Sequence, residues 1–126
     1  MREKALAFYR EGYNCSQSIL KAAEALYAVP MPEQSVDMCC CVNMGLGTGG
    51  LCCALIGSVM LFGLMFDEDE AKKLRIELMD MFYQQYGSLN CCLLSANGTN
   101  TTACEKIIAD AAGMTQQIIE ESRRQA

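Results

Sequence analysis

Cysteine is the residue type in this chain with the widest chemistry, and it is present nine times in 126 residues, without a single histidine. The absence of histidine excludes a Cys-His catalytic couple, a zinc site with imidazole ligands and a haem attachment motif of the C-x-x-C-H type. What remains is the chemistry of the thiol itself. A thiolate attacks disulfides and other oxidants as a nucleophile, and it binds soft metal ions.

Several cysteines fall where helices are expected to begin. Asn14 is a good N-cap with Gln17 three residues later, which places Cys15 in the first turn of a helix. Similar signals precede three other positions, so the set is Cys15, Cys52 or Cys53, Cys91 and Cys104. The free N–H groups and the positive dipole end of a helix start stabilise a thiolate and lower its pKa.

We therefore expect these four cysteines to converge in one pocket and form a shared site. Two chemistries stay open for it. The thiols could work as exchanging pairs in a redox reaction, or they could be four ligands for zinc or an iron–sulfur cluster.

The other cysteines are weaker candidates for the shared site. Adjacent residues on a helix point about 100° apart, so neighbouring cysteines do not share a face. We interpret most of them as small buried hydrophobic residues; they are Cys39, Cys40, Cys41, Cys92 and the second member of the pair at 52–53. No C-x-x-C is present, so no thioredoxin-like or ferredoxin motif is claimed.

The periodicity of apolar residues predicts an all-α protein, a compact multi-helix bundle in one helical domain over residues 1–126. A buried central apolar helix is expected at about 51–65. Further helices are predicted at 2–11, from Asn14 towards Pro30, from Asp67 to Tyr86, briefly after Ser88, and from a capping box of Thr102 with Glu105.

Residues 38–66 carry no charge, but they are unsuited to crossing a membrane. A glycine-rich run at 45–50 interrupts them and their flanks are acidic. That run also satisfies G-x-G-x-x-G, with Asp67 about 20 residues on, as in a dinucleotide site. Residues 38–44 could be a preceding strand, but the rest of the chain supplies no further strands for a doubly wound sheet. We therefore set that interpretation aside and expect a tight turn before a helix.

The net charge of −5 opposes binding to nucleic acid or to an anionic membrane. The chain opens with Met1-Arg2-Glu3-Lys4 and shows no apolar secretory segment, so we expect a reducing, cytoplasmic location. The expected partner is a small molecule or a protein with a thiol or disulfide group, and a homodimer stays open.

Three segments and one cysteine together resemble the C-GCAxxG-C-C family of redox-active proteins. They are GYNCSQSIL (12–20), GLGTGGLCCALIGSVMLFGL (45–64), YGSLNCCLL (86–94) and Cys104. The resemblance implies a small helical protein that works through thiols or a bound metal, with no established substrate. It places the family's four invariant cysteines at Cys15, Cys52, Cys91 and Cys104.

Ala54 and Gly57 match the rest of the family's central motif, and Cys53 stands where its glycine is expected. This departure leaves open whether Cys52 or Cys53 is the counterpart of the family's cysteine.

The sequence thus favours a thiol-based redox protein, a thiol/disulfide oxidoreductase if it is an enzyme. The alternatives are a metal- or cluster-binding module with the same four cysteines, and a helical interaction domain with inert cysteines. We expect Cys52 to react first, with Cys53 as its substitute, because the preceding glycines would let backbone N–H groups and substrate approach the sulfur.

Overall fold

The computed structural model describes residues 1–90 and 101–125, with side chains from residue 104 onward in the second part. The described chain is helical, which confirms the all-α expectation. Its elements are α1 (Arg2–Arg10), α2 (Cys15–Tyr27), α3 (Glu33–Asp37), a glycine turn (Gly45–Gly49), α4 (Cys53–Met65), α5 (Glu68–Tyr86) and α7 (Thr101–Gln125).

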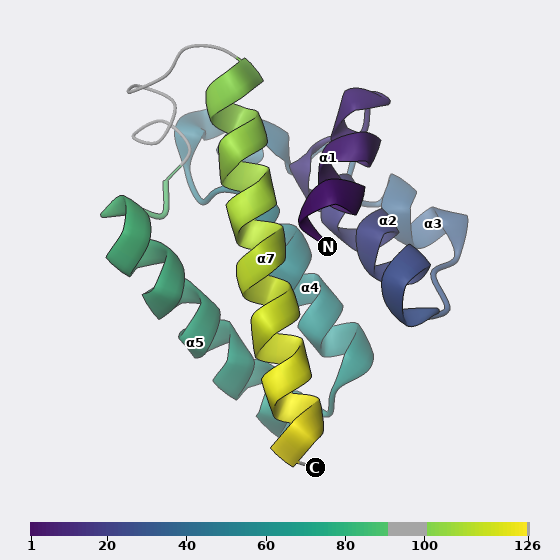
Figure 1. Ribbon diagram of the computed structural model, residues 1–126. Helices are drawn as coiled ribbons and strands as arrows, with labels where there is room; N and C mark the ends of the chain where they lie inside the picture. Colours follow the sequence, from purple (N-terminus) through teal and green to yellow (C-terminus); the bar gives the residue numbers. More distant parts are fainter. Residues whose placement is uncertain (91–100, 126) are drawn as a thin grey trace.

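The helices form a bundle in which α4 and α7 contact most of the others. Helix α4 packs against α2, α5 and α7, while α1 packs against α2 and α7. In Figure 1, α5, α7 and α4 run side by side, and α1, α2 and α3 lie together on the other side of α4. The starts of α2, α4 and α7 are thus brought to one region.

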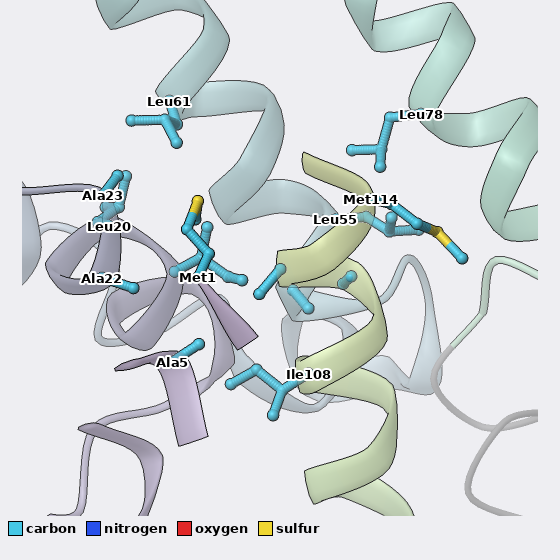
Figure 2. Packing of buried hydrophobic residues seen from close by; sticks show 14 of the residues in the cluster. Met1, Ala5, Leu20, Ala22, Ala23, Leu55, Leu61, Leu78, Ile108 and Met114 are labelled. Atoms are coloured by element: carbon cyan, nitrogen blue, oxygen red, sulfur yellow. The ribbon is translucent and has the colours of Figure 1, made fainter. Parts of the chain in front are cut away.

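The core is apolar and centres on α4, as expected for the segment 51–65. Leu55, Leu61 and Phe62 are fully buried and belong to one apolar cluster with residues of the neighbouring helices. Figure 2 shows Leu55 and Leu61 in this cluster with Leu78 of α5 and Ile108 of α7. The helix is not buried on all sides, however. Met60 and Leu64 are exposed, because no described element covers that face of α4.

Helices α2 and α4 approach each other at a glycine. A Cβ built on Gly57 would lie 2.6 Å from the Cα of Ser16 and 2.8 Å from its carbonyl oxygen. Only a residue without a side chain allows this distance. The Ser16 hydroxyl, fully buried at the contact, donates a hydrogen bond to the Cys53 carbonyl and so joins the first turns of the two helices.

Asp110 fixes α1 and α5 on α7. Its carboxylate accepts hydrogen bonds from Arg2 at 2.6 Å, from Gln85 at 2.8 Å and from Tyr86. Burial raises the pKa of Asp110, but the hydrogen bonds from Tyr86 and Arg2 outweigh it, so the net shift is downward and the carboxylate stays ionised. This network holds the beginning of α1 against the middle of α7.

The predicted helix starts are partly confirmed. Asn14 and Gln17 form the expected capping box, with Gln17 N–H donating to Asn14 Oδ1 at 2.9 Å and Asn14 N–H donating to Gln17 Oε1 at 3.0 Å. Asp67 caps α5 as predicted.

Two predicted starts differ. Residues Leu89 and Asn90 are not helical, because the Leu89 carbonyl accepts the Cys52 N–H at 2.8 Å and Asn90 pairs with Leu51 in an isolated β-bridge. Any helix beyond them lies outside the described residues. Helix α7 already begins at Thr101, so Thr102 lies inside it instead of capping it.

The glycine run forms the tight turn that was expected. Gly45, Gly47 and Gly49 have positive φ angles, and a Cβ on Gly45 would lie 2.3 Å from the Gly50 nitrogen. Residues 38–41 follow α3 as a turn, so no strand leads into the run and a dinucleotide-binding motif is excluded. Within the described residues, no helix is long and apolar enough to span a membrane.

The contact at Gly57 predicts an opposite response of two glycines on the same helix. Gly57→Ala should lower the free energy of unfolding by about 1–3 kcal/mol, because the new methyl group meets the α2 backbone. Gly63→Ala is the matched control: its Cβ meets nothing within 4 Å, so it should be neutral or stabilising by up to about 1 kcal/mol. Urea unfolding measures both, and equal effects would contradict the close approach.

Candidate thiol site

A cavity of about 340 Å³ lies where α1, α2, α4 and α7 meet, and four cysteines line it. Its lining comprises Tyr9, Gly12, Asn14, Cys15, Asn43, Met44, Cys52, Cys53, Cys104 and Ile107. The structure therefore brings together Cys15, Cys52, Cys53 and Cys104 from three helix starts. Cys91, the remaining predicted member, lies outside the described residues.

Cys53 occupies the first position of α4 and is 3% exposed. Its Sγ accepts a hydrogen bond from the backbone N–H of Ser16, the second residue of α2, at 3.2 Å. The Ser16 Oγ lies at the same distance from the sulfur. One sulfur thus lies at two helix N-termini, where unpaired N–H groups and both dipoles favour negative charge.

Cys15 and Cys53 share a hydrogen bond that shifts their pKa values in opposite directions. The bond from Cys15 is the largest cause lowering the pKa of Cys53, and Ser16 adds to it against the effect of burial; the result is a pKa of about 6. The same bond, together with burial, raises the pKa of Cys15 above its ordinary value of 9.0. The geometry supports Cys53 as the acceptor of the pair, because the Ser16 N–H is directed at its sulfur.

Cys104 faces the cavity from the fourth position of α7, beside Tyr9 of α1. Burial and the neighbouring thiols Cys104 and Cys15 raise the pKa of Tyr9 to about 12, and a hydrogen bond to Cys104 contributes. Tyr9 stays a neutral donor. Tyr9 could not be identified from the sequence, because only the packing of α1 on α7 brings it near a cysteine.

Cys52 is buried at the N-cap of α4, and both its backbone N–H and its carbonyl form hydrogen bonds. The N–H donates to Leu89, and the carbonyl accepts from Leu55 at 3.0 Å. The Ser16 N–H directed at the Cys53 sulfur supports Cys53 as a thiolate. The donors to its sulfur also come from α2, whereas the sequence argument assigned that role to the glycine run, which lies outside the cavity lining.

The three consecutive cysteines at 39–41 differ in their exposure to solvent. Cys39 is buried as predicted, with its thiol 3.6 Å from the Ser35 carbonyl. Cys40 and Cys41 are exposed, so their interpretation as core was wrong; they lie in a surface turn after α3, with their sulfurs 3.6 Å apart. Cys92 lies outside the described residues.

The metal-binding alternative requires at least three ligands around one point. Among residues 1–90 and 104–125, no group of three or more cysteine or carboxylate side chains is arranged to hold a metal ion. The described part of the site thus does not supply the donor set for zinc or an iron–sulfur cluster.

Comparison with known families agrees with the geometry. The model of a family described as "Putative redox-active protein (C_GCAxxG_C_C)" matches residues 13–118. In the printed pattern the cysteine directly precedes alanine, an order that Cys53, Ala54 and Gly57 follow. This order corrects the placement expected from the sequence, which put the family's glycine at Cys53 instead of Cys52. Neither curated proteins nor solved structures gave a match. The match spans most of the chain, and this protein therefore belongs to the C_GCAxxG_C_C family.

Proposed function

We propose that the protein is a thiol-based redox protein in which Cys53 is the nucleophile and Cys15 the resolving thiol. One observation carries this proposal: the backbone N–H of Ser16 donates to the Cys53 sulfur at 3.2 Å inside the cysteine-lined cavity, and the pKa of this thiol is lowered to about 6. A thiolate paired with a protonated thiol is the arrangement that dithiol exchange requires.

The reaction proceeds in two exchanges. The Cys53 thiolate attacks one sulfur of a disulfide RSSR, forms a Cys53–SR mixed disulfide and releases RS⁻. The Cys15 sulfur then attacks Cys53, its proton passes to the departing thiolate, and RSH leaves. The protein loses two electrons and one proton and gains the Cys15–Cys53 disulfide, while RSSR becomes RSH and RS⁻.

Cys104 is proposed as a second resolving thiol on the same cavity, with Tyr9 as the donor that orients it. Cys15, Cys53 and Cys104 are free thiols here, as in the reduced state of such a site. A reducing cytoplasm would regenerate this state.

Trapping the intermediate tests the order of the two thiols. Cys15→Ser keeps a hydroxyl donor beside Cys53 but cannot form a disulfide, so with Cys104 also replaced by serine the Cys53 mixed disulfide should accumulate. Intact-protein mass spectrometry after reaction with a small disulfide measures it. The background should carry Cys40→Ser and Cys41→Ser, because the exposed pair would react as well.

The protein with Cys15 intact should instead lose two thiols without retaining the probe. Retention of the probe on Cys15, or an adduct on Cys52 in place of Cys53, would contradict the assigned roles.

The pH dependence tests the hydrogen bond. Because Cys53 reacts as a thiolate with a pKa of about 6, its alkylation rate should be flat above neutral pH and fall as pH drops through 6. Cys15→Ala removes the largest cause of the shift and should move the midpoint upward, whereas Cys15→Ser should move it less. An unchanged midpoint in Cys15→Ala would show that Cys15 is not the donor.

A further inference from the structure

The cavity around Cys53 has no charged side chain among its lining residues. The sequence extends this observation. No Asp, Glu, Lys or Arg occurs in residues 12–20, 38–66 or 87–104, the three segments that contain all the cysteines. The undescribed residues 91–100 therefore bring no charge to the site, whatever their position.

Two charged groups beside the cavity form an ion pair. Arg10 and Glu105 make two contacts of 3.1 and 3.3 Å. The Lys21 ammonium lies over the rings of Phe8 and Tyr13, 5.6 Å from each centroid. Among the described residues, no cation lines the cavity to receive an anionic group of a ligand.

A charged ligand would therefore lose its hydration without gaining a counter-ion, which is strongly unfavourable in a buried site. An anion would in addition be repelled by the Cys53 thiolate. A cation would gain from that thiolate at first, but exchange moves the negative charge to the leaving group, so the bound half would be left unpaired. A neutral molecule avoids each of these penalties.

Access also limits the size of the substrate. Cys53 is 3% exposed and reachable through a cavity of about 340 Å³. A disulfide on the surface of a folded protein cannot reach such a sulfur without opening the bundle. Apolar walls from Met44 and Ile107, with Asn14 and Asn43 as neutral polar groups, suit a small molecule.

We propose that the substrate of this site is a small uncharged molecule with a reactive sulfur–sulfur bond, selected by a cavity whose lining has no acidic or basic side chain. This inference rests on the proposed redox function and narrows its partner to a small molecule.

Three disulfides of similar size test it: bis(2-hydroxyethyl) disulfide is neutral, cystamine is cationic and 3,3′-dithiodipropionate is anionic at pH 7. Mass spectrometry follows their single-turnover reaction with the reduced protein carrying Cys40→Ser and Cys41→Ser. Each rate is divided by the rate of the same probe with the urea-unfolded protein, which corrects for intrinsic reactivity. The neutral probe should be favoured by at least ~10-fold over either charged probe, equivalent to about 1.4 kcal/mol.

A charged probe that reacts as fast as the neutral one after this correction overturns the inference but leaves the redox function standing. If Cys53 reacts with none of the three in the folded protein while the unfolded protein reacts with all, the proposed function itself fails.

A gain-of-function variant gives an independent check. Met44 lines the cavity and is 69% exposed, so Met44→Lys would place a cation at its opening without disturbing the core. The corrected rate of 3,3′-dithiodipropionate should rise severalfold in Met44→Lys and not in the matched Met44→Gln. Equal rates in both variants would show that charge at the cavity does not select the substrate.

Discussion

Two helices begin side by side in this protein, and Gly57 sets how close they come. Because the Gly57 position carries no Cβ, the α2 backbone at Ser16 lies against α4 one turn from its start. The Ser16 N–H then reaches the sulfur of Cys53. If the helices were separated by the width of a methyl group, the strongest backbone donor to that sulfur would be lost.

The start of α2 is held on its other side as well. Asn14 donates through its side-chain amide to the Cys39 carbonyl at 2.8 Å, and Gln17 donates in the same way to the Val36 carbonyl at 3.1 Å. The two residues that cap α2 thus also anchor it to α3 and the following turn. Capping, helix packing and the position of the thiolate depend on the same few residues. The charge on Cys53 is stabilised by neutral donors alone, an N–H and an S–H, in a setting where burial opposes it.

The sequence predicted most of the helices because their signals are local. Caps such as Asn14 with Gln17 and Asp67 with Glu70 act within four residues, and apolar periodicity marks the buried faces. The sequence could not support a choice between Cys52 and Cys53, because adjacent positions at a helix start differ only in direction. The proposed role of Cys53 rests on Ser16, 37 residues away. Tyr9 was missed for the same reason. Cys40 and Cys41 were wrongly predicted to be buried, because cysteine is commonly a core residue, whereas the turn after α3 leaves these two at the surface.

The group of Ser16 that donates to the Cys53 sulfur is the backbone N–H, which limits how substitutions at position 16 can affect this hydrogen bond. Every amino acid except proline supplies the same N–H, so no ordinary replacement at position 16 deletes that hydrogen bond. Replacements there are limited by volume, since the side chain is fully buried, and by the hydrogen bond of the Ser16 hydroxyl to the Cys53 carbonyl. The constraint on this N–H donor therefore falls on position 57. Gly57 makes no hydrogen bond to the sulfur, but its lack of a side chain decides whether the bond can form.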